Sequence, residues 1–311
     1  MHYWMSVHYQ TTIQRPIEAE GVGLHTAVHC KMRLLPAPAD TGIVFRRVDL
    51  DNFEVEALGR NVARVSYATS LMKQGVWLST TEHLLAALYS SGIDNVCVEL
   101  DALELPILDG SAQRFIEMLD EAGLRRLRKP RRYLRVARPL EFSDRDRRIG
   151  IYPCDEFRVK CVIDFPHRLI GHQTTELIVT AESFRRELAS ARTFGFVEEV
   201  ERLRAQGLVR GGSLDNAIVL TRHGVMNPEG LRFPDEFARH KTLDLIGDLA
   251  LLGLPLQASV VAHKAGHALH TQLVMRLLSD PSLWVKTTDS SSAADHAASG
   301  RQSASVLQAS S

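Results

Sequence analysis

The sequence predicts an α+β fold built from two domains. Its 311 residues are about twice the usual domain length of roughly 150 residues. In both halves candidate strands precede candidate helices, and this grouping is typical of layered α+β folds rather than doubly wound ones. Hydrophobic residues make up 45% and charged residues 24% of the chain, which is the composition of a globular protein with a substantial core.

The first predicted domain covers residues 1–127. Alternating apolar residues indicate strands, and apolar residues that recur every three or four positions indicate helices. These patterns predict strands at 28–35, 42–48 and 96–100, and helices at 79–91 and 112–122. Ser79 stands three residues before Glu82, which is the spacing of a capping box at a helix start.

The second predicted domain covers residues 128–286. The same patterns predict strands at 149–152, 158–165 and 217–220, and helices at 181–189, 198–206 and 236–252. The segments GIDNVCVEL and GSLDNAIVL, one in each half, suggest a duplicated unit. Residues 287–311 are rich in serine and alanine and contain no aromatic residue, so we expect a disordered tail there.

A strongly basic segment joins the two halves. Residues 125–138 carry eight arginines and lysines and no acid, which fits either an anion-binding patch or a solvated linker between domains. The chain has 37 basic and 37 acidic residues and therefore no net charge. This balance favours the linker and argues against a dedicated nucleic-acid-binding protein.

Cysteine spacing and hydropathy indicate a cytoplasmic protein. The four cysteines form no C-x-x-C pair, so neither a disulfide framework nor a cysteine zinc site is indicated. The longest apolar run, residues 249–262, is interrupted and falls short of the ~20 residues that span a bilayer. Residues 1–12 lack the apolar core of a secretory signal. We therefore expect no transmembrane helix.

One predicted helix carries three polar residues on a single face. His240, Asp244 and Asp248 are spaced by four, so each is rotated by only ~40° and raised by ~6 Å from the one before. His240 and Asp244 can reach one metal ion. Asp248, ~12 Å from His240 along the axis, is better placed to orient a neighbouring group. The alternative is a solvated helix face with an i,i+4 pair.

Glu82 and His83 are adjacent at the start of another predicted helix. In zinc hydrolases such a histidine binds the metal and such a glutamate takes a proton from water, although helix capping is the alternative for Glu82. The complete H-E-x-x-H motif is absent. A zinc site would therefore have to bring His83 to His240 and Asp244 from a distant segment.

Further candidates are found near position 193 and after position 262. Thr193, in SARTFGF, is either a donor to an oxyanion or a β-branched strand residue. His263, His267 and His270 follow a strand-like run, and any of them could be a surface residue. Gly266 suggests a tight turn that presents one imidazole to a cleft, where a carboxylate-held histidine can act as a general acid.

Six motifs occur together and in order. They are TEHLLAAL, LDGSA, ARTFGF, GGSLDNA, RHKTLDLIGDL and HKAGHAL. On these motifs the chain resembles the UDP-3-O-acyl-N-acetylglucosamine deacetylase family, zinc amidases that commit bacteria to lipid A synthesis, from about residue 12 to residue 278. The resemblance implies two domains of similar topology, with the helices sandwiched between the sheets and the active site at the junction.

The resemblance also implies a role for each matched residue. The implied ligands of one zinc ion per chain are His83, His240 and Asp244. The implied catalytic residues are Glu82 as general base, His267 with its carboxylate partner Asp248, and Thr193 as a donor to the oxyanion. The implied contacts with sugar, diphosphate, nucleotide and passage entrance are Lys241, Lys264, Phe165 and Phe194. The segment 196–214, with Val200, Leu203, Leu208 and Val209, corresponds to the insertion that forms an acyl-chain passage.

The expected reaction is therefore hydrolysis of the acetamide of UDP-3-O-acyl-N-acetylglucosamine, with release of acetate. The alternative is a zinc amidohydrolase that acts on a different N-acetylated sugar. Either His267 or Glu82 could protonate the leaving amine, and His263 is either a competing ligand or a neutral substitution. The expected partner is the UDP-linked acylated amino sugar, with no nucleic acid, and we expect the protein to be a monomer.

Overall fold

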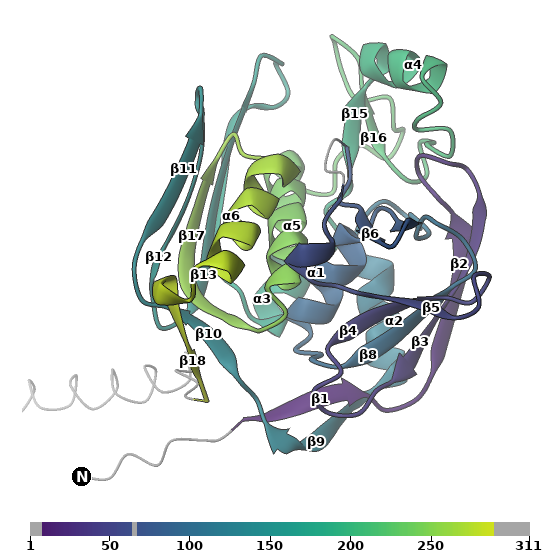
Figure 1. Cartoon of the computed structure of the whole chain (residues 1–311). Coiled ribbons are helices and arrows are strands. Elements are labelled where there is room, and N and C mark those ends of the chain that lie inside the picture. The colour runs from purple at the N-terminus through teal and green to yellow at the C-terminus, as the bar shows by residue number, and fades with distance from the viewer. Residues whose placement is uncertain (1–7, 64–66, 289–311) are drawn as a thin grey trace, which may run out of the picture.

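The computed structural model describes residues 8–63 and 67–288. Two β-sheets form the outer layers of this part of the chain, and the helices lie between them (Figure 1). The predicted α+β sandwich is thus confirmed. Most of the predicted tail lies outside the described residues, but its first residue, Thr287, belongs to a strand, so the predicted start of the tail was wrong.

The first sheet has the strand order β2-β3-β8-β4-β5. Its strands are β2 (Ile17–Val22), β3 (His29–Pro36), β4 (Ile43–Arg47), β5 (Phe53–Glu56) and β8 (Val96–Leu100). The helices of this half are α1 (Glu82–Ser90) and α2 (Gln113–Ala122), with a 3-10 turn at Gly59–Asn61. A small hairpin of β6 (Leu71–Lys73) and β7 (Val76–Leu78) precedes α1.

The second sheet contains the path β11-β12-β17-β13-β14, with β10 paired to β17 and β18 paired to β10. Its strands are β10 (Tyr133–Val136), β11 (Leu140–Asp144), β12 (Arg147–Pro153), β13 (Phe157–Phe165), β14 (Gly171–Ile178), β17 (Leu256–His263) and β18 (Trp284–Thr287). Its helices are α3 (Ala181–Glu187), α5 (Glu236–Leu249) and α6 (His267–Ser279), with 3-10 turns at Ala250–Leu252 and Pro281–Leu283.

The two halves repeat one topology. Apart from the β6–β7 hairpin in the first half and the elements from α3 to β16 in the second, each half has two antiparallel pairs of strands followed by a helix, a fifth strand and a second helix. The fifth strand, β8 or β17, inserts between the pairs, antiparallel to one neighbour and parallel to the other. Hence β8 corresponds to β17, α1 to α5 and α2 to α6, and the predicted similarity of the two halves is confirmed.

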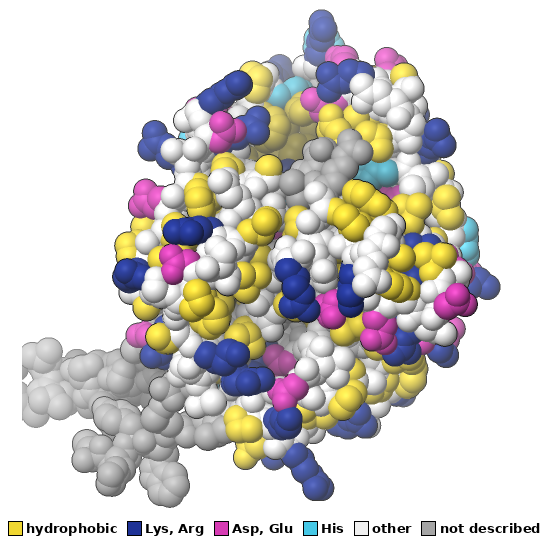
Figure 2. Space-filling model, in the orientation of Figure 1, with side chains coloured by type: hydrophobic (Ala, Val, Ile, Leu, Met, Phe, Trp, Pro, Cys, Tyr) yellow, Lys and Arg dark blue, Asp and Glu magenta, His cyan; other side chains and the backbone are white. Residues whose placement is uncertain are grey.

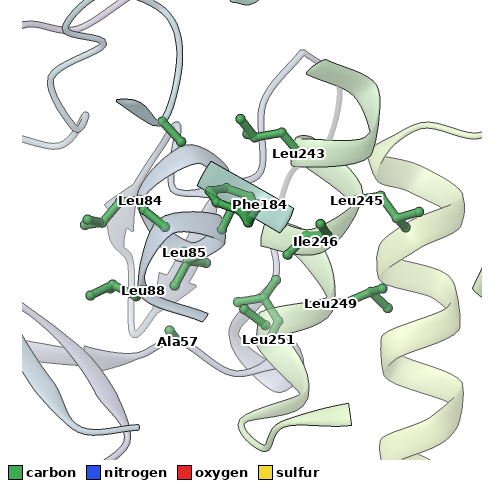
Figure 3. Close-up of a cluster of buried hydrophobic side chains, with 14 of the residues drawn as sticks. Ala57, Leu84, Leu85, Leu88, Phe184, Leu243, Leu245, Ile246, Leu249 and Leu251 are labelled. Atoms are coloured by element: carbon green, nitrogen blue, oxygen red, sulfur yellow. The ribbon is translucent and has the colours of Figure 1, made fainter. Parts of the chain in front are cut away.

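Helices α1 and α5 pack against each other at the centre of the sandwich. Figure 3 shows buried leucines of both helices together with Phe184 of α3. At the crossing, a Cβ atom on Gly247 would lie 2.1 Å from the backbone oxygen of Glu82. The close approach of the helices therefore depends on the missing side chain, and it brings the first turn of α1 beside the C-terminal half of α5.

The basic segment is not the solvated linker that the sequence favoured. Its first part is β9 (Leu124–Pro130), which pairs antiparallel with β1 (Tyr9–Ile13), and its second part is β10. The side chains of β9 are mostly exposed, while Arg131 forms an ion pair with Asp94 at 2.8 Å. The segment joins the two halves through ordered strands, because β1 supplies the backbone hydrogen bonds. The predicted domain boundary after residue 127 falls inside β9.

Two local predictions also need correction. Helix α1 begins at Glu82 rather than at residue 79, and no capping box forms, because Thr80 has a left-handed φ of 59° and Thr81 occupies the N-cap. The bend after β17 lies at Lys264, with a φ of 51°. Gly266 has an extended backbone and is the N-cap of α6, a helix that the sequence analysis did not predict.

An excursion between α3 and α5 lies at the top of the molecule (Figure 1). It contains β15 (Phe194–Phe196), α4 (Val197–Ala205) and β16 (Ile218–Leu220), and the two strands pair in parallel. This excursion includes the segment 196–214 for which the sequence predicted an acyl-chain passage. Within the described residues, no helix is both long and apolar enough to cross a membrane.

Candidate metal centre

Helix α5 carries His240, Asp244 and Asp248, and its carboxylates face α1 and α6. All three side chains are buried, which excludes the alternative of a solvated helix face. The Nδ1 atom of His240 lies 3.1 Å from the backbone oxygen of Ala191, so Nδ1 carries the proton and Nε2 keeps its lone pair. Burial lowers the pKa of His240 to about 3, which keeps the imidazole neutral, as a metal ligand must be.

His83 meets the α5 residues from the facing helix. Its Nε2 atom lies 3.6 Å from Oδ1 of Asp244, and Nε2 of His240 lies 3.4 Å from the same oxygen. Two ligands that are each 2.0–2.1 Å from a tetrahedral ion are separated by about 3.3–3.4 Å. Two imidazoles and one carboxylate at this spacing fit the donor set of a catalytic zinc site.

Two other groups of potential ligands overlap with this one. They are Asp248 with His267 and His270, and Glu82 with Asp244 and His267. Asp248 already accepts hydrogen bonds from both of its histidines, at 2.7 and 2.8 Å. The triad of His83, His240 and Asp244 is therefore the best candidate for a metal site among the described residues.

Lys241 sets the charge of the Asp244 carboxylate. Its Nζ donates to Oδ2 of Asp244 at 2.7 Å, which leaves Oδ1 facing the two histidines. Burial alone would raise the pKa of Asp244, but the Lys241 cation beside it holds this pKa well below its ordinary value. Lys241 also lies over the ring of Phe194, with 5.6 Å between Nζ and the ring centroid. The carboxylate is thus kept ionised, as metal binding requires.

Glu82 lies next to the triad. Its Oε2 atom accepts a hydrogen bond of 3.1 Å from the backbone nitrogen of Thr69, and its Oε1 atom lies 3.9 Å from Nε2 of His267. The side chain is 3% exposed, and burial raises its pKa above the ordinary value. A carboxylate with a raised pKa is suited to accept a proton near neutral pH.

His267 is held by Asp248 at the start of α6. The Nδ1 atom of His267 lies 2.7 Å from Oδ2 of Asp248, so Nε2 is directed toward Glu82 and Asp244. Burial alone would lower the pKa of His267, but Asp248 raises it to about 9. Thr69 donates to the other oxygen of Asp248. His267 is therefore cationic at neutral pH, as a general acid must be before it donates.

Thr193 is anchored beside the same group. Its backbone nitrogen donates to Gly110 at 2.8 Å, and its backbone oxygen accepts from Ile218. Gly110 belongs to the LDGSA motif and has a φ of 79°, and a Cβ there would lie 2.0 Å from the backbone oxygen of Asn216. Arg192, which precedes Thr193, is buried and pairs with Glu236 at the start of α5. These contacts bring the ARTFGF, LDGSA and GGSLDNA motifs together in the structure.

A small cavity of about 30 Å³ is enclosed by these side chains. That volume holds a water molecule, which needs about 10–15 Å³. The cavity is lined by side chains of the site, namely Glu82, His83, Thr193, His240, Lys241, Asp244 and His267, and by Leu24, His25, Tyr67, Ala68, Thr80 and Ile107.

A second cavity of about 370 Å³ adjoins it and shares Leu24, His25, Tyr67 and Thr193. Its remaining walls are mostly apolar and come from α4, β15 and the segment after α4. Figure 2 shows hydrophobic side chains at the top of the molecule beside this excursion. Val200, Leu203 and Val209, from the segment for which the sequence predicted an acyl-chain passage, line this cavity, whereas Leu208 is not among its lining residues.

Some predicted residues lie away from the cavities. Lys264 forms ion pairs with Asp146 and Asp164, at 3.2 and 2.9 Å, and lines neither cavity. His263 belongs to none of the potential metal groups among the described residues. Phe165 contacts the ring of Phe194, which lines the larger cavity, at a centroid distance of 5.8 Å.

Two features of the site were not predicted from the sequence, namely Thr69 and the close contact of His270 with Asp248. Thr69 touches Glu82, Asp248 and His267 at once. It lies between the first predicted strands and α1, in a stretch without a motif, so no pattern could have identified it. His270 was one of three candidate histidines, and only the structure reveals that it is buried against Asp248.

Known proteins of one family are similar to this chain over most of its length. The sequence model of the family described as UDP-3-O-acyl N-acetylglycosamine deacetylase matches residues 10–279. Three relatives are named UDP-3-O-acyl-N-acetylglucosamine deacetylase. The protein of Solibacter usitatus is 55% identical over 89% of this chain and 94% of its own length. The proteins of an Anaeromyxobacter species and of Myxococcus xanthus are 48% and 45% identical, each over 90% of this chain and over 91% and 89% of their own lengths.

Proposed function

The chain belongs to the UDP-3-O-acyl N-acetylglycosamine deacetylase family, and from this we propose that it hydrolyses the acetamide of UDP-3-O-acyl-N-acetylglucosamine in lipid A biosynthesis. The products are acetate and the UDP-linked 3-O-acyl-glucosamine. The observation that carries the proposal is the buried triad of His83, His240 and Asp244 beside Glu82, in a cavity that adjoins a larger apolar one.

We propose that the triad holds one zinc ion. A zinc ion with three protein ligands lowers the pKa of water to about 7 and polarises a carbonyl group. The neutral His240 and the ionised Asp244 suit this ion, because both lone pairs are available without loss of a proton. Lys241 keeps one carboxylate oxygen occupied, so that Asp244 offers the other.

Glu82 acts as the general base. Water attacks the acetyl carbon while Glu82 takes its proton, and the raised pKa of this buried carboxyl favours the transfer. The backbone nitrogen of Thr69 holds Oε2 of Glu82, which leaves Oε1 toward His267 and the cavity. Thr193 lines the same cavity and donates to the oxygen that becomes negatively charged.

His267 supplies the proton that the leaving nitrogen needs. Its Nδ1 is bound to Asp248, so the proton on Nε2 is the one that can be transferred. As the carbon–nitrogen bond breaks, this proton passes to the amine. The negative charge of Asp248 keeps His267 cationic until that step. Of the two donors that the sequence left open, this geometry favours His267 over Glu82.

The larger cavity takes the 3-O-acyl chain. Burial of a chain of about twelve methylenes is favourable by roughly 10 kcal/mol of transfer free energy, at ~0.8 kcal/mol for each methylene. Val200, Leu203 and Val209 supply apolar surface for it. Phe194 lines the larger cavity, and its ring contacts Lys241 of the site and the aromatic ring of Phe165.

The proposal is tested by measuring zinc content and acetate release for purified variants. Wild type should contain about one zinc per chain and release acetate from the UDP-linked acylated substrate. His240→Ala should lose both, and Glu82→Gln should keep zinc but lose activity. His263→Ala is the matched control, because this histidine lies outside the potential metal groups, and it should retain both.

An active His240→Ala, or a metal-free wild type with full activity, would contradict the zinc assignment. Full activity of Glu82→Gln would contradict the assignment of the base. Activity that is equal with and without the 3-O-acyl chain would favour a different N-acetylated sugar as the substrate.

A further inference from the structure

Asp248 accepts hydrogen bonds from two imidazoles on the same oxygen. The Nδ1 atoms of His267 and His270 lie 2.7 and 2.8 Å from Oδ2. The two histidines are three residues apart on α6 and therefore share one face of the helix. Thr69 donates to the other carboxylate oxygen. Asp248 is thus held at both oxygens, by two elements outside its own helix.

His270 has no part in the reaction described above, yet its environment is restrictive. Its side chain is 1% exposed. Its Nε2 atom is buried and has no hydrogen-bond partner in the described part of the chain. A buried imidazole with only one partner is stable in the tautomer that places its proton on the bonded nitrogen. Nδ1 of His270 is therefore a donor to Asp248, and the ring is neutral.

We propose that His270 is a positioning residue that acts through Asp248 on His267. This inference rests on the proposed function, in which His267 donates the proton. His270 occupies one lone pair of Oδ2, so only the other lone pair is available to His267. The direction of that second lone pair fixes the orientation of the His267 ring. The rings of the two histidines meet edge to face, with centroids 6.0 Å apart, so His270 also limits the tilt of His267.

Without His270, the Oδ2 atom loses its second donor and the ring of His267 loses a neighbour. Asp248 would still attract His267, but the carboxylate of Asp248 could rotate more freely. The Nε2 proton of His267 would then point less often at the leaving nitrogen. Loss of such a supporting hydrogen bond lowers activity by about 10-fold to 100-fold in comparable sites. The effect falls on kcat, because orientation of the proton matters in the transition state and not in substrate binding.

Three substitutions at one position separate positioning from packing. Asparagine carries its amide nitrogen as far from the backbone as Nδ1 of histidine, so His270→Asn keeps the donor to Asp248. Glutamine carries its amide nitrogen nearer to the position of Nε2, and leucine has no donor. We expect His270→Gln and His270→Leu to lower kcat by about 10-fold with unchanged KM and zinc content, and His270→Asn to restore most of the loss.

Proton and nitrogen NMR of histidine-labelled protein supplies a readout that does not need turnover. In wild type, the nitrogen shifts of His270 should report a protonated Nδ1 and an unprotonated Nε2. The Nδ1 proton of His267 should shift in His270→Leu and return toward its wild-type position in His270→Asn. If wild type releases no acetate, the proposed function fails while these spectra still test the hydrogen bonds.

The proposal is overturned by any of three results. The first is a wild-type His270 that carries its proton on Nε2. The second is a His270→Leu with wild-type kcat. The third is a loss of activity that is equal in His270→Asn and His270→Leu, or that is accompanied by loss of zinc, because a purely structural role would produce it.

Discussion

Substitution of Gly247 by alanine should disable the metal centre more than it destabilises the fold. The added Cβ would lie 2.1 Å from the backbone oxygen of Glu82 and 2.8 Å from its carbonyl carbon. Real Cβ contacts essentially never fall below 3.0 Å, so α1 and α5 must separate locally by about 1 Å. Both contacts are with backbone atoms, and no side-chain rotation relieves them.

The consequence for the site follows from its position across this crossing. His83 moves with α1, whereas Asp244 stays with α5, and their ligand atoms are now 3.6 Å apart. A displacement of about 1 Å at a catalytic constellation costs about 100-fold in rate. Overpacking costs about 1–3 kcal/mol of folding stability, but replacing glycine by alanine in a helix returns about 1 kcal/mol. The net loss of stability should therefore stay below about 2 kcal/mol.

The assay combines zinc affinity, by competition with a chelator, with kcat/KM for acetate release and thermal unfolding of the apoprotein. Gly224→Ala is the matched control, because a Cβ there meets nothing within 4 Å. It should change none of the three measurements. A Gly247→Ala variant with wild-type zinc affinity and kcat/KM would refute the reasoning that the helix crossing sets the ligand geometry.

Three further predictions address the acid, the surface lysine and the apolar cavity. Because Asp248 raises the pKa of His267 to about 9, activity that needs the cation should persist up to about pH 9. In Asp248→Asn the alkaline decrease in rate should occur at a lower pH than in wild type. An alkaline decrease at the same pH as in wild type would contradict the pairing of Asp248 with His267. Lys264→Ala should change kcat/KM little, because the lysine is paired with two surface carboxylates; a large rise in KM would instead support the diphosphate contact implied by the family resemblance. Val200→Trp should raise KM for the acylated substrate by about 10-fold or more, and it should leave KM for an analogue without the acyl chain unchanged. An equal rise in KM for both compounds would argue against this cavity as the acyl site.

Five of the six predicted strands, β3, β4, β8, β12 and β13, lie inside the two large sheets, whereas the sixth, β16, belongs to a two-stranded pair. β8, with the sequence VCVEL, is buried along its whole length and was predicted to the residue. The edge strands β2, β5, β11 and β14 were not predicted. β2, for example, reads IEAEGV and is partly exposed, so its polar residues hide the strand pattern. An edge strand is defined by the neighbour that it pairs with, and that neighbour is distant in the sequence.

The same distinction applies to the site. The helical spacing of His240, Asp244 and Asp248 follows from one segment, and helix geometry alone separates the first two from the third. The approach of His83 could be argued from composition and the family resemblance, but its distance from Asp244 depends on a glycine at a helix crossing. Thr69 contacts Asp248 across 179 positions of sequence, and no local pattern encodes that contact.

The repeated topology gives the proposed metal an additional role as a tether. Its ligands are divided between α1 and α5, which are the equivalent helices of the two halves, so a bound ion links the halves without a covalent bond. By mass action, an ion that binds only the folded chain stabilises the folded state by RT ln(1 + [metal]/Kd), about 4.1 kcal/mol at 1,000 times Kd. The supply of zinc to the cell would then determine how long the protein survives proteolysis, in addition to how fast it turns over substrate.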